Sequence, residues 1–337
     1  MKKLIEGLSS YLAACFTFLI LLLGINDLGI CAPIKVGVLA PDGTNWANKL
    51  QKMSQAVKTA TNGEVEFKMY LGGVSGDEPD VLRKIRVGQL QGGIFTGRTL
   101  GDIYGDVRVI ELPFNFKKDR VKAWKTLQKF APTFDKGFTK NGFKNLGYFE
   151  LGNVYVVSTK KVNNINELKG IKIWSWEGDK LASGLVESLD LVSVPLALPD
   201  VLSSLSTGVI EAAYANPLGV IALQWQTKIK YLVDFPVTFS MGAFLITDKV
   251  WSKVPEKYKS TVESIVKKFV DEANLQTIQE NEEALAVLKK NGVEFISFPN
   301  SDISRGEEIR EKVIKKLTGP IISQDMVKAF NEQAKKI

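Results

Sequence analysis

The sequence predicts an α/β protein with two lobes, braced by one long helix. Three observations carry this prediction. Segments typical of strands and helices alternate along the chain, and its 337 residues exceed what one hydrophobic core usually organises. Residues 256–290 contain neither proline nor glycine, so they are expected to form a helix long enough to contact both lobes. Alternating strands and helices favour a mainly parallel sheet covered by helices.

Residues 1–31 are predicted to be a signal peptide. Two lysines precede an uncharged apolar run at residues 11–25, which is shorter than the roughly 20 residues of a spanning helix. Cleavage near Cys31 fits best, and the alternatives are a lipid anchor or an uncleaved N-terminal anchor. Both cysteines, Cys15 and Cys31, lie in or beside this segment. The mature domain is therefore expected in the periplasm without an internal disulfide.

The first half of the mature chain reads as repeated strand and helix units. Strands are predicted at residues 34–40, 65–71, 93–95 and 145–159, with helices after residue 45, at 78–89 and after Pro113. The strand near residue 152 is a natural crossing point between lobes. We assign residues 34–152 plus 241–280 to lobe I.

The second half continues the same alternation. Strands are predicted at residues 171–176, 191–196 and 209–215, with helices at 179–189 and 199–206. A strand-like segment at residues 235–247 returns the chain to the first lobe. We assign residues 153–240 plus 281–337 to lobe II.

The composition excludes the common catalytic centres. The chain contains no histidine, so Ser-His-Asp and Cys-His centres and the usual zinc sites cannot form. The glycine-rich residues 92–97 match neither a dinucleotide nor a phosphate-loop motif. We therefore expect no enzyme activity, no cofactor and no metal. A lyase or isomerase using Glu177, Asp179 or Tyr214 is the catalytic alternative, and helix capping is the alternative role of the two carboxylates.

The net charge of +7 would suit a nucleic-acid partner. However, the lysines and arginines are scattered among acidic residues, without a basic run or an interleaved ladder of aromatic residues. We therefore expect no nucleic-acid binding.

Loops at the carboxyl ends of the predicted strands hold the candidate ligand-binding residues, because ligands of α/β lobes bind there. Trp174 and Trp176 alternate on one strand, so both side chains should face the same side and form an aromatic wall; core packing is the alternative role. The candidates are Asn45, Trp46, Thr96, Arg98, Glu150, Asn153, Trp174, Trp176, Glu177, Tyr214, Asn216 and Trp225.

Several short motifs resemble the DctP-type solute-binding proteins of tripartite ATP-independent periplasmic (TRAP) transporters. They include VIELPFNF at residues 109–116, INELKGIKI at 165–173, LSTGVIE at 205–211 and VWSKVP at 250–255. The motifs follow the family's order over residues 34–298. The resemblance implies a two-lobed, periplasmic-binding-protein-like fold with a hinge and a long bracing helix. It also implies capture of a small organic ligand and its delivery to integral-membrane permease subunits. A periplasmic sensor or scaffold with the same fold is the alternative function.

The chain departs from this family at positions where arginine is expected. The family places an arginine directly after the KGIKI strand, where it binds a ligand carboxylate, and this chain has Trp174 there. Val154 stands at a second position where some acid-binding relatives carry arginine. The chain thus resembles a subgroup that lacks the arginine, is associated with a tetratricopeptide-repeat partner and takes apolar ligands. A largely apolar or weakly polar ligand is expected, and a carboxylate-binding TRAP receptor is the alternative.

Overall fold

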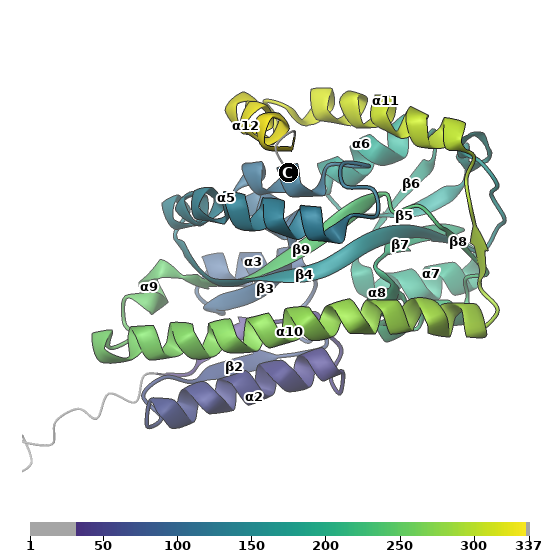
Figure 1. Cartoon of the computed structure of the whole chain (residues 1–337). Helices are drawn as coiled ribbons and strands as arrows, with labels where there is room; N and C mark the ends of the chain where they lie inside the picture. The colour runs from purple at the N-terminus through teal and green to yellow at the C-terminus, as the bar shows by residue number, and fades with distance from the viewer. Residues whose placement is uncertain (1–31, 335–337) are drawn as a thin grey trace, which may run out of the picture.

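The structure is a computed structural model of the whole chain, and it describes residues 32–334. The predicted signal peptide and its cleavage site lie outside the described residues. Within the described part, every helix is too short or too polar to span a membrane. A ten-stranded mixed sheet forms the centre of the molecule, and helices cover it on several sides (Figure 1).

One half of the sheet has the strand order β2-β1-β3-β9. The first three strands are parallel, and β9 runs antiparallel to β3. These strands are β1 (Ile34–Gly37), β2 (Phe67–Tyr70), β3 (Gly92–Thr96) and β9 (Thr238–Thr247). The helices of this half are α2 (Asn45–Ala60), α3 (Glu78–Arg86), α4 (Gly97–Ile103), the 3-10 helix η1 (Gly105–Glu111), α5 (Arg120–Lys140) and α9 (Asp248–Trp251).

The other half has the strand order β7-β5-β6, and β8 and β10 pair beside it. Its strands are β5 (Lys172–Trp176), β6 (Val192–Leu196), β7 (Ala212–Ala215), β8 (Tyr231–Val233) and β10 (Glu294–Ile296). Its helical segments are η2 (Ile165–Leu168), α6 (Lys180–Ser188), η3 (Leu198–Asp200), α7 (Val201–Thr207), α8 (Pro217–Ala222), η4 (Trp225–Thr227), α11 (Asn300–Leu317) and α12 (Gln324–Ala334).

A single long strand, β4 (Phe143–Ser158), joins the two halves, as the sequence predicts. Most of its length pairs with β9, and its last residues pair with β7 and β8. The register with β9 shifts between Glu150 and Gly152, where the backbone of Gly152 has a φ of 97°. A register shift of this kind bends a strand locally. The bend lies where the sequence predicts the crossing between lobes.

The long helix α10 (Glu256–Lys290) packs along β4, against α2 at one end and α8 towards the other (Figure 1). Its 35 residues correspond to a length of about 52 Å. The side chain of Asn274 fixes it to β4, because it accepts a hydrogen bond from the backbone N–H of Glu150 at 2.9 Å and donates to the carbonyl of Tyr148 at 3.0 Å. The predicted bracing helix is confirmed.

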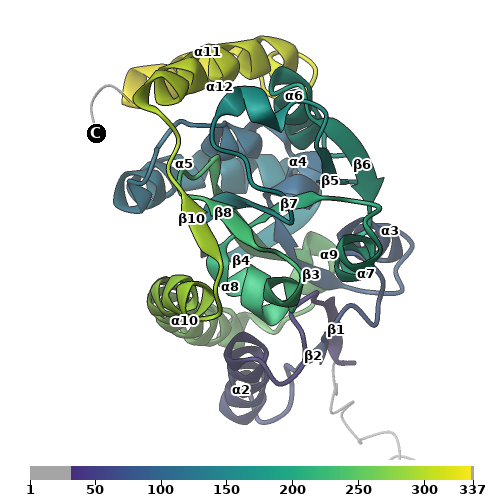
Figure 2. The ribbon, with the colours of Figure 1, turned by 90° about the vertical axis from the view of Figure 1, so that its right-hand side faces the viewer.

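The C-terminal helices α11 and α12 were not predicted from the sequence. Helix α11 packs beside α6 (Figure 2), and α12 packs against η1. Phe330 of α12 is buried against Phe130 of α5, with ring centroids 5.9 Å apart. The chain end therefore contacts elements of both halves, and the lobe boundaries given above stay a prediction.

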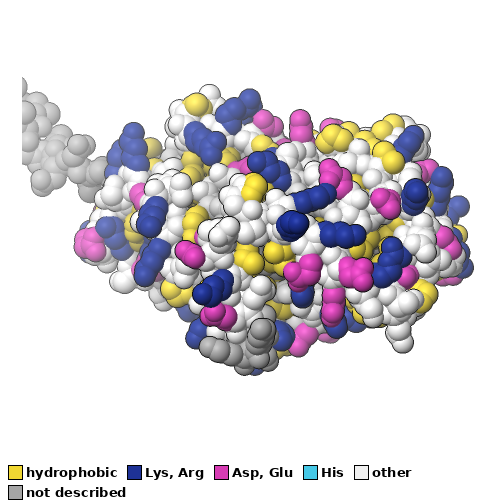
Figure 3. Space-filling view, turned by 90° about the horizontal axis from the view of Figure 1, so that it is seen from above, with side chains coloured by type: hydrophobic (Ala, Val, Ile, Leu, Met, Phe, Trp, Pro, Cys, Tyr) yellow, Lys and Arg dark blue, Asp and Glu magenta, His cyan; other side chains and the backbone are white. Residues whose placement is uncertain are grey.

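The surface that carries α5, α11 and α12 mixes charges of both signs (Figure 3). Lysine and arginine side chains alternate there with aspartate and glutamate, and small apolar areas lie between them. This face has no extended basic area of the kind that a polyanion would need.

Candidate ligand-binding cleft

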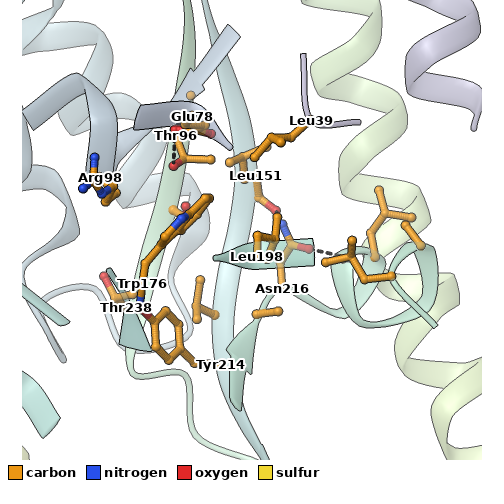
Figure 4. Close-up of a pocket in the computed structure, with 18 of the residues that line it drawn as sticks. Leu39, Glu78, Thr96, Arg98, Leu151, Trp176, Leu198, Tyr214, Asn216 and Thr238 are labelled. Atoms are coloured by element: carbon orange, nitrogen blue, oxygen red, sulfur yellow. Dashed lines mark hydrogen bonds between the residues drawn. The ribbon is translucent and has the colours of Figure 1, made fainter. Parts of the chain in front are cut away.

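A cavity of about 610 Å³ lies between the two halves of the molecule. Side chains from both halves line it, including Leu39 and Thr96 from one half and Trp176 and Tyr214 from the other (Figure 4). Most of the lining atoms are apolar. Its volume is in the range of sites that enclose small organic molecules.

Aromatic side chains form one wall of this cavity. The ring of Trp174 stacks on Tyr214 at a centroid distance of 4.8 Å. The ring centroids of Trp176 and Trp225 each lie 5.6 Å from that of Trp174. Trp174 is only 2% exposed, and its indole N–H donates to the carbonyl of Leu196 at 3.0 Å. Trp174 and Trp176 lie on one side of β5, as the alternation predicts. The two proposed roles therefore coexist, because the same rings pack a core and face the cavity.

An apolar recess extends the cavity between α6 and the sheet. Leucine and valine side chains of α6 face strands β4 and β5 across it, and valine side chains from β4 and the segment before β9 complete it. Only Val154 among these residues was singled out from the sequence, as a position where some relatives carry arginine. The recess is lined by Val154, Val156, Ile173, Leu181, Ala182, Leu185, Val186, Leu189, Leu191 and Val237.

A few polar groups face the cavity from β3, α3 and the β7–α8 turn (Figure 4). The carboxyl of Glu78 accepts hydrogen bonds from the backbone N–H of Thr96 at 2.9 Å and from its hydroxyl at 3.1 Å. Burial raises the pKa of Glu78 from its ordinary value of 4.5 to about 8. Asn216 caps α8 and donates to the carbonyl of Leu151 at 2.7 Å. These groups could orient a ligand through uncharged hydrogen bonds.

A buried ionic cluster joins η1 to the start of α6 at the cavity. Nη2 of Arg108 donates to both carboxylate oxygens of Asp179, each at 3.0 Å, and Nε lies 3.3 Å from a carboxylate oxygen of Glu111. Burial alone would lower the pKa of Arg108, but the charges of Asp179 and Glu111 outweigh it and raise that pKa. Burial also raises the pKa of the Glu111 carboxyl. The cluster spans the two halves of the molecule.

Nine of the twelve predicted residues line the cavity: Asn45, Trp46, Thr96, Arg98, Trp174, Trp176, Tyr214, Asn216 and Trp225. Arg98 was expected in a loop after the third strand, but it lies in the first turn of α4. Its side chain pairs with Asp102 and donates to the backbone carbonyl of Glu177 at 2.7 Å. Contact between these nine residues and a ligand stays a prediction.

The other three predicted residues, Glu150, Asn153 and Glu177, do not line the cavity. Glu150 is 2% exposed, and its carboxylate accepts a hydrogen bond from Nε of Arg120 at 2.7 Å. Asn153 donates to the carbonyl of Lys118 at 3.4 Å. Alternate residues of a strand face opposite sides, and a loop position alone does not fix where a side chain points. These three residues were predicted to lie near the cleft only because they occupy loops at the ends of predicted strands.

Glu78, Arg108 and Glu111 line the cavity but were not predicted from the sequence, whereas Asp179 was considered as a helix cap, a ligand contact or a catalytic group. Asp179 does cap α6, accepting from the backbone N–H of Leu181. A signal for the cluster is present in the chain, since Arg108 and Glu111 stand within an otherwise apolar run. Charged residues in such runs are rarely buried unless they are paired.

The comparison with protein families decides the family of this chain. The profile of DctP, described as bacterial extracellular solute-binding protein, family 7, matches residues 36–319. The chain belongs to this family. The resemblance inferred from the short motifs is therefore confirmed, whereas membership of the subgroup that lacks the arginine stays a prediction.

Two curated proteins are similar to this chain over most of its length. An uncharacterized protein of Haemophilus influenzae is 25% identical over 82% of this chain and 84% of its own length. The sialic acid-binding periplasmic protein SiaP of Vibrio cholerae is 20% identical over 86% of this chain and 91% of its own length.

Two solved TRAP periplasmic solute-binding proteins show the same fold. One from Haemophilus influenzae, with bound L-gulonate, has a TM-score of 0.82 and 21% identity and covers 90% of this chain and 98% of its own. One from Desulfovibrio salexigens, with bound orotic acid, has a TM-score of 0.81 and 22% identity and covers 90% of this chain and 99% of its own. The predicted two-lobed α/β fold of this DctP protein is therefore confirmed.

Proposed function

We propose that this DctP protein is the extracytoplasmic receptor of a TRAP-type secondary transporter. It captures a small organic ligand in the cavity between its lobes and delivers it to the integral-membrane permease subunits. The family assignment and the cavity between two lobes support this proposal. A periplasmic location fits the family assignment and the proposed receptor role.

The ligand is an organic molecule with a largely apolar body and one or two hydrogen-bonding groups. The observation that carries this step is the apolar recess, which is lined by apolar side chains alone. Val154 and Trp174, which stand where arginine binds carboxylates in the family resemblance, both line the cavity. An apolar ligand body would gain about 25 cal/mol for each Å² of surface removed from water here.

A carboxylate-binding TRAP receptor is the second candidate. Arg98 and Arg108 line the cavity, and arginine is the side chain best suited to bind a carboxylate. Solved proteins of the same fold contain bound L-gulonate and orotic acid. Both arginines, however, already pair with carboxylates of this chain.

The partners follow from the transport proposal. A permease with a small and a large integral subunit would accept the ligand, and the resemblance to the arginine-lacking subgroup adds a tetratricopeptide-repeat periplasmic protein as a further partner. Two permease genes beside the gene for this chain would support transport. Their absence, together with a neighbouring signalling gene, would favour a sensor or scaffold.

Isothermal titration of the purified protein tests the proposal. A solute panel contains octanamide as an apolar uncharged probe and octanoate and D-glucuronate as carboxylates, and X-ray scattering follows compaction. Native mass spectrometry of the same preparation detects co-purified small molecules. We expect binding of the apolar amide with a smaller radius of gyration. A protein that binds D-glucuronate tightly and no apolar solute would favour the carboxylate receptor. A rigid protein that binds nothing would count against both.

A further inference from the structure

Arg108 lines the cavity, and its Nη2 already binds a carboxylate of this chain. Nη2 donates to both oxygens of Asp179, each at 3.0 Å. The side chains of Arg108 and Asp179 are 6% and 9% exposed, so the pair is withdrawn from water although both residues belong to the cavity lining. A guanidinium recognises carboxylates through paired N–H groups. Here the chain itself supplies the carboxylate.

Glu111 brings a second carboxyl group to the single positive charge of Arg108. One of its carboxylate oxygens lies 3.3 Å from Nε, on another edge of the same guanidinium. A ligand carboxylate at this position would bring a further negative group to a single cation. Like charges at such short distances in a poorly solvated site repel strongly. An uncharged ligand group would meet no such repulsion.

The position of Asp179 is fixed by the fold as well as by Arg108. As the N-cap of α6, its carboxylate also accepts from the backbone N–H groups of Leu181 at 2.9 Å and Ala182 at 3.2 Å. Leu181 and Ala182 line the apolar recess. A ligand with its apolar body in the recess would therefore place one end beside Asp179 and Arg108.

We propose that Asp179 is the residue that sets the ligand's charge. It binds Nη2 of Arg108 from within the chain and adds a negative charge beside it, and so it selects ligands that carry an uncharged group at this end. The inference rests on the proposed function, because it takes the cavity as the ligand site. It adds a residue responsible for discrimination between an acid and its uncharged analogue.

The variant Asp179→Asn tests this selection. Asparagine keeps the shape and the helix cap but removes the negative charge. Titration with octanoate and octanamide, which differ mainly in charge, gives the ratio of their two affinities. We expect the variant to shift this ratio towards octanoate by about tenfold relative to the wild type. Asp119→Asn is the matched control, because Asp119 caps α5 outside the cavity.

A purely structural role of Asp179 would weaken both probes alike and leave the ratio unchanged, which would overturn the inference. If the wild type and the variant bind neither probe, the proposed apolar ligand is wrong. A second measurement then still decides whether the edge of Arg108 accepts an external carboxylate.

That second measurement is rescue of Asp179→Ala by formate. The alanine variant leaves space beside Arg108 for a small carboxylate. We expect formate to raise the melting temperature of this variant by about 2–4 °C relative to chloride at equal ionic strength. Formate should leave the wild type and Asp119→Ala unaffected. Equal responses of all three proteins would overturn the inference, and if Asp179→Ala does not fold, Asp179→Asn with the two probes carries the test alone.

Discussion

The indole N–H of Trp176 donates a hydrogen bond to a carboxylate oxygen of Asp77 at 2.7 Å. Trp176 ends β5, and Asp77 is the N-cap of α3, so the bond joins the two halves of the molecule across the cavity. The contacts of Arg98 with the carbonyl of Glu177 and of Arg108 with Asp179 cross between the same halves. Together these contacts hold the lobes against each other around the cavity.

The variant Trp176→Phe should weaken this contact between lobes. It keeps an aromatic ring at the wall but leaves the buried carboxylate of Asp77 without its indole donor. We expect the free energy of unfolding to fall by about 1–3 kcal/mol, and the radius of gyration to rise in the absence of ligand. Urea unfolding and X-ray scattering measure both. Trp251→Phe, on α9 and outside the cavity, is the control; equal effects of the two changes would contradict the prediction.

The variant Ala182→Phe should close part of the apolar recess. Ala182 lies on α6, is 5% exposed and lines the recess, so a phenyl ring there would fill space that an apolar ligand needs. We expect affinity for octanamide to fall by at least about tenfold, with a stability cost of about 1–3 kcal/mol from overpacking. Isothermal titration gives the affinity. Lys180→Phe, on the exposed side of the same helix, should leave the affinity unchanged. Unaltered binding by Ala182→Phe would place the ligand elsewhere.

Much of the arrangement of helices and strands could be predicted, because it depends on the pattern of neighbouring residues. The long helix Glu256–Lys290 follows from an uninterrupted stretch without proline or glycine. The common orientation of Trp174 and Trp176 follows from the two-residue period of a strand. The crossing strand β4 follows from apolar residues on both sides of Gly152. Each of these features is decided by residues close together in the chain.

The chemistry of the cavity could not be predicted in the same way. Arg108 and Asp179 are 71 positions apart, and only the packing of η1 against the start of α6 brings them together. The recess has the same cause, since leucines of α6 that pack in the apolar core also border the cavity. Side-chain direction explains the three misplaced candidates as well, because Glu150 pairs with Arg120 outside the cavity. The spacing of neighbouring residues in the sequence does not indicate which distant side chains will pair in the folded protein.

Glu78 should make the stability of the protein depend on pH. Burial raises the pKa of its carboxyl in the folded state from 4.5 to about 8. Between these values the folded protein retains a proton that the unfolded chain releases, so the free energy of unfolding falls as pH rises from about 4.5 to 8. The loss from this one group is about 5 kcal/mol. Its full contribution is present below pH 4.5.

The variant Glu78→Gln removes that titration. We expect its free energy of unfolding to fall less than that of the wild type between pH 5 and pH 8.5, as measured by urea unfolding. The buried carboxyls Glu111 and Glu150, whose pKa values burial also raises, remain in both proteins. The difference between the two curves therefore isolates Glu78. Glu308→Gln, at an exposed position, is the control, and parallel curves for wild type and Glu78→Gln would refute the assignment.

Gly152→Ala tests whether the bend of β4 is the hinge. Gly152 lies at the register shift with a φ of 97°, and a Cβ there would lie 3.0 Å from Nδ2 of Asn281 on α10. Gly142→Ala is a matched control, because Gly142 has a φ of 81° and nothing within 4 Å of its Cβ position. Each change should cost about 1–2 kcal/mol of stability from the same backbone strain. If the lobes pivot at the bulge, only Gly152→Ala should also reduce the compaction that ligand causes in X-ray scattering, because only there does the new side chain restrict the bend. Equal compaction in the two variants would place the pivot in another segment.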